Sequence, residues 1–330
     1  MRLSEMKREK IMNRSCLTLL TKSANPLIIL FLLCQSAEPA KKILPSAESE
    51  ALSRFLWSLR NSKLFGATDV SDSFCEEKYD LYYKINCTSI DNTWHITAIS
   101  LSSVHLDGYI DPVVKNLTYL EILDLSRNDL EGPIPHELGS LSHLTDLYLF
   151  NNFLNGSIPP SLGNLSSLEL MYLAYNRVSG SIPVELGELG KLERLDLKDN
   201  ELNGSLPKEL GKLSNLRTLY LSSNYFTGNL PEEYQNITTM ESFHVAGNYL
   251  TGPFPKFVVK WVNLLFLDLG GNNFEDELPP EIFTMTNLQT LRVSDLNHTG
   301  FQLQKSIDQH VYSGTAELQY YRSNPTIYIC

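Results

Sequence analysis

Apolar and polar positions along this chain follow a pattern that repeats every 24 residues. Between residues 123 and 207 the motif LxLxxNxLxGxIP is seen as LDLSRNDLEGPIP, LYLFNNFLNGSIP and LDLKDNELNGSLP. The recurring asparagines are Asn128, Asn152, Asn176, Asn200, Asn224, Asn248 and Asn272, and the recurring prolines are Pro135, Pro159, Pro183, Pro207, Pro231, Pro255 and Pro279. A period held without a single insertion predicts a repeat architecture in which neighbouring repeats stack on one another.

Each part of the motif predicts a local structure. The LxL part alternates apolar and polar residues, so a short strand directs its leucines into the core. Stacked repeats bring these strands side by side in a parallel sheet, roughly 4.8 Å apart. The asparagine amide can donate and accept, so it can satisfy backbone groups that the following turn buries. Gly-x-Ile-Pro predicts a second turn and an extended segment on the flank. We therefore predict an α/β repeat solenoid with a parallel concave sheet, containing about nine repeats over residues 95–296.

The ends of the repeat region are expected to be degenerate. The asparagine position is Val104 in the first repeat and Leu296 in the last. Residues 38–94 are predicted to form an N-terminal cap with a short helix, whose apolar face would comprise Ala51, Leu52, Phe55, Leu56 and Leu59. Cys75 and Cys87 are close in sequence and are predicted to form a disulfide in an oxidising compartment. Residues 297–330 are expected to be an irregular tail, which would leave the last repeat open.

The N-terminus predicts export from the cell. Basic residues precede an apolar run at 27–34, which is too short to cross a bilayer, so residues 1–37 are assigned as a signal peptide. The formal charge of the whole chain is −11. Removing six basic and two acidic residues with the signal gives −11 − 4 = −15. A surface this acidic disfavours nucleic acid and anionic membrane as partners.

The pattern LxxLxxLxLxxNxLxGxIPxxLGxL resembles that of plant extracellular leucine-rich repeats. Residues 246–297, with Trp261 and the LRVSDLN stretch, resemble the end of the ectodomain repeats in one subfamily of receptor-like kinases. Those receptors carry a malectin-like domain, a membrane anchor and a serine/threonine kinase after the repeats. The chain contains no GxGxxG, VAIK, HRD or DFG segment. The resemblance therefore implies a non-enzymatic part of a receptor, truncated before the malectin-like domain, that binds a ligand or co-receptor at the cell surface.

Two alternatives differ in class from a receptor ectodomain. One is a free-standing secreted binder that resembles the polygalacturonase inhibitors, which have similar length and the same repeat class. Those proteins carry paired cysteines in both caps, and this chain has no C-terminal pair. The other alternative is an enzyme such as a glycosidase that uses Asp196 and Asp199. An open sheet offers no cleft to exclude water from these carboxylates, so catalysis is not expected.

Ligand contacts are predicted on the concave face, at the polar positions between and after the strand leucines. Exposed aromatic residues beside lysine and arginine are typical of protein and peptide interfaces, and aromatic rings also stack on sugars. Sheet propensity alone is the competing explanation for tyrosine at these positions. The candidate ligand-binding residues are Tyr148, Phe150, Tyr172, Tyr175, Arg194, Asp196, Lys198, Tyr220 and His244. No second histidine or cysteine is expected near His244, so neither a metal nor another cofactor is predicted. The expected partners are a peptide, a protein or a cell-wall carbohydrate, with a possible co-receptor.

Seven Asn-x-Ser/Thr sequons that follow the predicted signal peptide predict N-glycosylation in the secretory pathway. Asn116, Asn164 and Asn236 each lie twelve residues before a repeat asparagine, which predicts a convex position. Asn155 and Asn203 each lie three residues after one, on the flank. Asn86 lies in the cap and Asn297 at the end of the repeats. No sequon falls in the strand positions, so glycans are expected to leave the concave sheet bare.

Overall fold

The computed structural model describes residues 43–59, 75, 84–275, 278–293, 318–321 and 326–329. The chain divides into two compact units, Met1–Ile43 and Leu44–Cys330. The predicted signal peptide at 1–37 lies outside the described residues, and the architecture below is that of the second unit.

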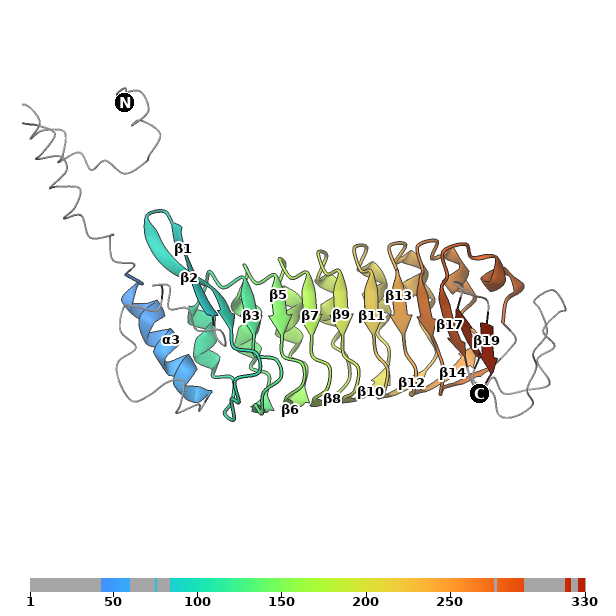
Figure 1. Ribbon diagram of the computed structural model, residues 1–330, viewed down its shortest axis with the longest axis horizontal. Helices are drawn as coiled ribbons and strands as arrows, with labels where there is room; N and C mark the ends of the chain where they lie inside the picture. The colour runs from blue at the N-terminus through green and yellow to red at the C-terminus, as the bar shows by residue number, and fades with distance from the viewer. Residues whose placement is uncertain are drawn as a thin grey trace, which may run out of the picture. The chain divides into compact units, whose positions relative to one another are not determined.

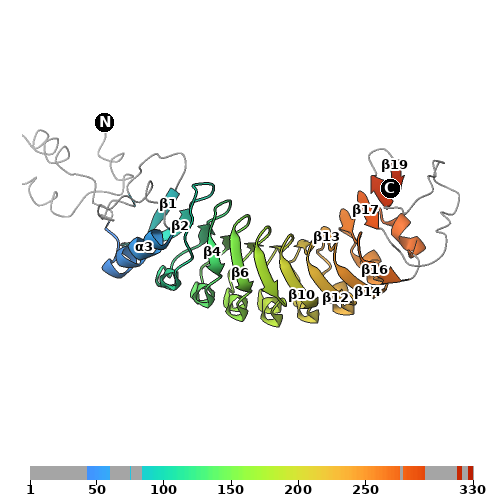
Figure 2. The same cartoon turned by 90° about the horizontal axis from the view of Figure 1, so that it is seen from below.

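A long sheet built from one strand per repeat dominates this unit (Figure 1). Its strands, in spatial order, are β1 (Lys84–Ile90), β2 (Thr93–Ser100), β3 (Ile122–Asp124), β5 (Asp146–Tyr148), β7 (Leu170–Tyr172), β9 (Arg194–Asp196), β11 (Thr218–Tyr220), β13 (Ser242–His244), β15 (Phe266–Asp268), β17 (Thr290–Val293), β18 (Leu318–Tyr321) and β19 (Thr326–Ile329). Strands β2 to β17 are parallel, and residues 24 apart stand opposite one another, as Leu123, Leu147 and Met171 do. Figure 2 shows that these repeats follow a curve, with the main sheet on its inner side.

A second, shorter sheet and a row of tight turns complete each repeat. The second sheet contains β4 (Glu131–Pro133), β6 (Phe153–Ser157), β8 (Arg177–Gly180), β10 (Glu201–Ser205), β12 (Tyr225–Gly228), β14 (Tyr249–Pro253) and β16 (Asn273–Glu275). The turns are 3₁₀ helices, η2 (Pro112–Asn116), η3 (His136–Ser140), η4 (Pro160–Asn164), η5 (Val184–Glu188), η6 (Lys208–Lys212), η7 (Glu232–Asn236), η8 (Lys256–Lys260) and η9 (Pro280–Thr284). From η3 to η9 the residue before each turn is the repeat proline, whose fixed φ suits entry into a helical turn.

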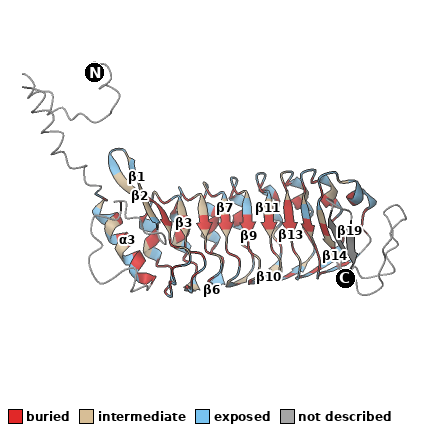
Figure 3. Cartoon of the chain, in the orientation of Figure 1, coloured by how far each residue is buried: buried red, intermediate tan, exposed pale blue. Residues whose placement is uncertain are grey.

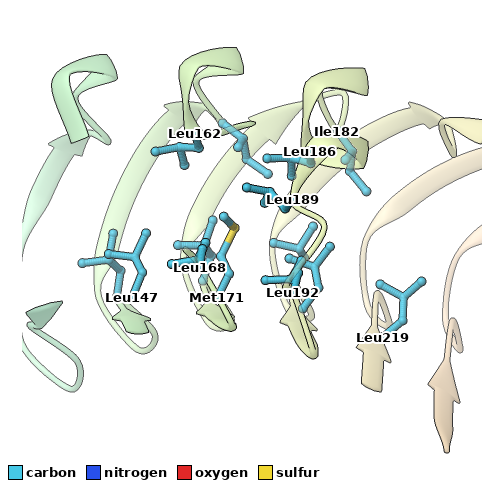
Figure 4. Close-up of a cluster of buried hydrophobic side chains, with 14 of the residues drawn as sticks. Leu147, Leu162, Leu168, Met171, Ile182, Leu186, Leu189, Leu192 and Leu219 are labelled. Atoms are coloured by element: carbon cyan, nitrogen blue, oxygen red, sulfur yellow. The ribbon is translucent and has the colours of Figure 1, made fainter. Parts of the chain in front are cut away.

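The core is one continuous column of apolar side chains between the two sheets and the turns. The strand leucines are almost completely buried, as Leu123, Leu147 and Leu195 show at 0 % exposure. Buried positions recur in every repeat (Figure 3), and leucines from successive repeats lie beside one another in the interior (Figure 4). No single repeat could remove these side chains from water by itself, so the stack is the unit of stability.

The repeat asparagines form a ladder that binds consecutive repeats through buried amides. The Nδ2 group of Asn200 donates to the carbonyl of Leu197 in its own repeat and to that of Leu173 in the preceding one, at 3.1 and 2.9 Å. Its Oδ1 accepts from the backbone N–H of Val178 at 3.0 Å. The same donor pattern recurs from Asn128 to Asn272. These bonds satisfy backbone groups that the turn would otherwise leave unpaired in the core.

At the N-terminal end, helix α3 (Ser46–Ser58) packs its apolar face on the first repeat. Leu52, Phe55 and Leu56 of this helix are buried in the same core as the strand leucines. Glu48 is also buried, and it accepts hydrogen bonds from the backbone N–H of Ile96 at 3.1 Å and from His95 Nδ1 at 2.5 Å. The helix therefore covers the core with leucine and phenylalanine and is fixed to β2 by a carboxylate.

Other parts of the cap lie on the same sheet. Strand β1 pairs antiparallel with β2 and extends the main sheet by one strand. A disulfide joins Cys75 to Cys87, which lies in β1.

The C-terminal segment differs from the expected irregular tail. Strands β18 and β19 form an antiparallel hairpin, and β18 pairs with the edge of β17, opposite Thr290–Val293. Both strand sequences, LQYY and TIYI, are rich in β-branched and aromatic residues, which favour extended backbone. The hairpin supplies partners for the backbone groups of β17, so the edge expected to be open is paired.

Within the described part of the chain, no helix combines the length and apolar character needed to cross a membrane.

Candidate functional site

Outward-facing residues of the main sheet line up in columns across the repeats. In each strand the residue after the buried middle residue points outward, because side chains alternate between the two faces of a sheet. The parallel register places one such residue directly beside the next, and this column reads Asp124, Tyr148, Tyr172, Asp196, Tyr220, His244, Asp268 and Arg292. The repeat therefore converts residues 24 apart in sequence into nearest neighbours on the concave face.

Tyr148, Phe150 and Tyr172 form an aromatic cluster at the N-terminal side of this face. The rings of Tyr148 and Tyr172 stack with their centroids 5.2 Å apart, and Phe150 meets Tyr172 edge-on at 6.4 Å. The hydroxyl of Tyr148 donates to Asp146 Oδ1 at 2.9 Å. Burial, and then this hydrogen bond and the charge of Asp146, raise the pKa of the Tyr148 hydroxyl. The hydroxyl consequently stays protonated, and the stacked pair offers a rigid aromatic surface.

Tyr175 lies at the end of the same repeat, in an unusual backbone conformation. Its φ is +55°, in the left-handed region that a bulky side chain adopts only at a cost, and its side chain is 49 % exposed. The same position has φ between +53° and +57° in Arg127, Asn151, Asp199 and Ser223, so the repeat imposes this conformation whichever residue is present. The repeat fixes the backbone here, and the exposed ring contributes little to the core, so the side chain at this position is available to the surface.

Lys198 joins Tyr175 to the next part of the face. Its Nζ lies 5.2 Å from the ring centroid of Tyr175 and 5.6 Å from that of Tyr220, within range of cation–π attraction to both. Asp196 is only 7 % exposed and lies 3.9 Å from Lys198. Burial raises the pKa of Asp196, and the nearby Lys198 opposes that change. Asp196 thus holds Lys198 in place, whereas the lysine is the more accessible of the two.

Arg194 lies at the junction of the two groups of aromatic residues. A side-chain hydrogen bond with Tyr172 is the largest of the influences that raise the pKa of this exposed guanidinium. Arg194 therefore belongs with the Tyr148–Tyr172 pair, although it opens the strand that carries Asp196.

His244 ends the cluster on the C-terminal side. Its ring lies 4.6 Å from that of Tyr220, and its Nε2 is 3.2 Å from the hydroxyl of Ser242. Burial, followed by the positive charges of Arg292 and Lys198, lowers the pKa of His244 to about 4. The imidazole is therefore neutral at pH 5 to 7.

The structure brings the nine predicted site residues together in two linked groups. Tyr148, Phe150, Tyr172 and Arg194 form one, and Tyr175, Lys198, Tyr220 and His244, with Asp196 beneath, form the other. Sequence reasoning missed Asp146 and Ser242, which hold Tyr148 and His244. Both lie two residues before the residue that they contact, which is the separation at which strand residues share a face. Arg127, also absent from the predicted set, covers Phe150 at 5.5 Å.

Of the six sequons that the structure describes, all but Asn86 lie outside the strands of the main sheet. Asn116, Asn164 and Asn236 are exposed and close the turns η2, η4 and η7, while Asn155 and Asn203 are exposed in the second sheet. Asn86 is half-buried in β1, and Asn297 lies outside the described residues. In the same described part, no three histidine, cysteine or acidic side chains assemble around a common point as metal ligands would.

The family model for the leucine rich repeat matches residues 166–226, and a second model of that description matches 119–141, 143–165 and 263–285. The fold is a leucine-rich-repeat solenoid. No curated protein sequence matches the chain. Among solved structures, this chain is similar to the plant peptide hormone receptor RGFR1 in complex with RGF2. The two are 35 % identical over 57 % of this chain and 30 % of that chain, at a TM-score of 0.54. The ectodomain of the Arabidopsis thaliana receptor kinase GASSHO1/SCHENGEN3, in complex with CASPARIAN STRIP INTEGRITY FACTOR 2, is 27 % identical over 73 % of this chain and 34 % of that one, at a TM-score of 0.61.

A plant ice-binding protein is also similar, with 26 % identity over 77 % of this chain and 79 % of that chain, at a TM-score of 0.62. The solenoid therefore spans about a third of the length of the two receptor structures and most of the ice-binding protein. Its structural neighbours include plant receptor ectodomains that bind peptide ligands.

Proposed function

We propose that this solenoid is an extracellular recognition module that binds a peptide or protein ligand through its concave face. The observation that carries the proposal is the run of outward aromatic rings from Tyr148 to Tyr220, joined by Lys198, along the main-sheet strands β5, β7, β9 and β11, none of which contains a sequon. Stable tyrosine surfaces beside a cation are typical of interface anchors. The similarity to peptide-binding receptor ectodomains supports the same function.

The test uses the full chain, exported by a secretory host so that its disulfide and glycans can form. Random twelve-residue peptides displayed on phage are selected against it, and the affinities of the selected peptides are then measured in solution. We expect Tyr148→Ala with Tyr172→Ala to weaken these peptides at least about tenfold, since each lost anchor costs more than about 1 kcal/mol.

The matched control is an equally aromatic pair on the other sheet. Tyr225 and Tyr249 are stacked at 6.2 Å and are 50 % and 55 % exposed. Replacing both by alanine removes the same chemistry from the flank, so affinity should not change. Loss of binding in the flank variant with retention in the concave variant would overturn the proposed site.

We further infer that the chain is exported, glycosylated and part of a receptor-like kinase that continues into a malectin-like domain, an anchor and a kinase. The resemblance of residues 246–297 to the end of such ectodomain repeats supports this inference. Sequencing the transcript through the Asn297 codon tests it, and a mobility shift after treatment with a glycosidase that removes N-glycans tests glycosylation.

The second candidate is a free-standing secreted protein that binds ice, because the chain is similar to most of a plant ice-binding protein. Ser157 and Ser205 end strands of the second sheet and Ser181 directly follows β8, so exposed serines recur one repeat apart along this flank. Ice recrystallisation in the presence of the purified chain tests this role. Unchanged crystal growth at concentrations that saturate the selected peptides would eliminate it.

A further inference from the structure

The outward strand positions in the N-terminal part of the concave face carry mainly negative charge. Residues 119–126, 143–150 and 167–174, which contain strands β3, β5 and β7, hold four carboxylates and neither lysine nor arginine. The carboxylates are Glu121, Asp124, Asp146 and Glu169. The nearest cations are Arg127, which directly follows the first of these segments and covers Phe150, and Arg194 in β9.

These carboxylates lie close to the stacked tyrosines. Asp124 stands directly opposite Tyr148 in the sheet register, and Asp146 accepts the hydrogen bond of the Tyr148 hydroxyl. Both charges contribute, after burial, to the raised pKa of that hydroxyl. Glu121, Thr145 and Glu169 occupy the same position in three successive repeats, just before the strands. The backbone N–H of Thr145 donates to the Glu121 carbonyl, and the backbone N–H of Glu169 donates to the Thr145 carbonyl. Both glutamates are exposed.

Three other rings of the candidate site lie beside a cation of the protein itself, and Tyr172 has Arg194 as its partner. Arg127 covers Phe150, and Lys198 lies between Tyr175 and Tyr220. The Tyr148 ring has carboxylates as its charged neighbours instead. A ring face beside negative charges attracts a cation, because the quadrupole of the ring and the Coulomb field act in the same direction.

We propose that the concave surface over β3, β5 and β7 binds an extended basic peptide segment, one of whose lysine or arginine side chains lies on Tyr148 between Asp124 and Asp146. This inference rests on the proposed function and assigns its ligand to one chemical class. The three strands span about 10 Å, so a segment of roughly four to six extended residues covers them, with alternate side chains directed at the sheet. The formal charge of −11 adds long-range attraction for a basic partner.

Three fluorescent synthetic peptides test the assignment by anisotropy. They consist of repeated Gly-Arg-Gly-Tyr, Gly-Gln-Gly-Tyr and Gly-Glu-Gly-Tyr units, so that only charge differs. We expect the arginine peptide to bind the full glycosylated chain at least about tenfold more tightly than the glutamine peptide in about 50 mM salt. Its advantage should shrink in about 300 mM salt, where exposed charges are screened. The glutamate peptide should bind most weakly.

The key variant replaces Asp124 and Asp146 by asparagine, which keeps the shape and one acceptor oxygen of each side chain while removing the charge. Affinity for the arginine peptide should fall about tenfold, while affinity for the glutamine peptide stays the same. The matched control is Glu185→Gln with Glu232→Gln, which removes two exposed charges from the turns of the outer side and should change neither affinity. This pair separates a local effect from a loss of net charge.

Equal affinity for the arginine and glutamine peptides, or unchanged affinity in the Asp124/Asp146 variant, would overturn the basic-ligand assignment. In that event the phage-selected peptides decide whether the proposed function also fails. If these peptides still depend on Tyr148 and Tyr172, the concave face is a binding site with a different class of ligand. If they do not, both inferences fail together.

Discussion

Truncating one asparagine of the ladder should weaken the whole solenoid, and Asn200→Ala is the informative choice. Asn200 is 8 % exposed and lies in the middle of the repeats. Its amide donates to the carbonyls of Leu173, Leu197 and Lys198 and accepts from the N–H of Val178. All of these groups belong to the backbone, so no other side chain needs to move when the amide is removed.

The size of the loss follows from which groups keep a partner. The Leu173 carbonyl also accepts from Asn176, and the Leu197 carbonyl also accepts from Asn224, so both retain a donor. The N–H of Val178 loses its acceptor, and an unsatisfied buried donor costs about 1–3 kcal/mol. With about 1 kcal/mol for the net loss of the remaining hydrogen bonds, the free energy of unfolding should fall by about 2–4 kcal/mol.

Urea unfolding followed by circular dichroism measures this loss, and Asn215→Ala is the matched control. Asn215 is exposed and donates a single hydrogen bond to the Gly190 carbonyl at 2.7 Å. Its replacement should change the free energy of unfolding by no more than about 0.5 kcal/mol. If Asn200→Ala were no worse than Asn215→Ala, the ladder would not hold the repeats together and the reasoning above would be refuted.

Three further predictions concern strain, close packing and pH. Tyr175→Asn should leave the free energy of unfolding unchanged or raise it by up to about 1 kcal/mol, because asparagine tolerates a φ of +55°. Tyr175→Ala keeps the strain and should lower the free energy of unfolding. A thermal unfolding experiment in which the alanine variant is the more stable of the two would contradict this reasoning. Gly163→Ala should cost about 1–3 kcal/mol, because its Cβ would lie 2.3 Å from the Glu185 carbonyl oxygen, while Gly190→Ala meets nothing within 4 Å and should be neutral in the same denaturation assay. His244 has a pKa of about 4 in the fold and about 6.5 when unfolded, so the unfolded chain binds the extra proton and stability should fall as pH drops from about 6.5 to 4. His244→Gln should remove that part of the slope, and a pH profile identical to wild type would exclude it.

The sequence predicted the scaffold well because its signals are periodic. The strand leucines and the helix face of Leu52, Phe55 and Leu56 follow from apolar spacing alone, and the structure buries them. The hairpin β18–β19 was missed, because two four-residue strands outside the repeat period give too short an alternating pattern to separate from irregular chain.

The candidate site was predictable only as columns of residues. Spacing places Tyr148 beside Tyr172, but it does not say that Asp196 lies buried under Lys198, which depends on how side chains pack. The left-handed conformation of Tyr175 did leave a signal in the sequence. Gly247 and Gly271 occupy the same position in later repeats with φ of +64° and +61°, and glycine is the residue that such a position favours.

Stability and recognition lie on different side chains in this fold, which explains how a regular repeat can carry a specific face. Leucines at the strand positions are buried from one end of the stack to the other, and the ladder amides bond mainly to backbone. The residues between them can therefore change without disturbing either the core or the ladder. Tyr175 illustrates this: its left-handed backbone is shared with Arg127 and Asp199 at the same repeat position, whereas its exposed ring is not. Because the repeat sets this φ, only the side chain differs from one repeat to the next, and Tyr175 places an aromatic ring beside Lys198 at the centre of the candidate site.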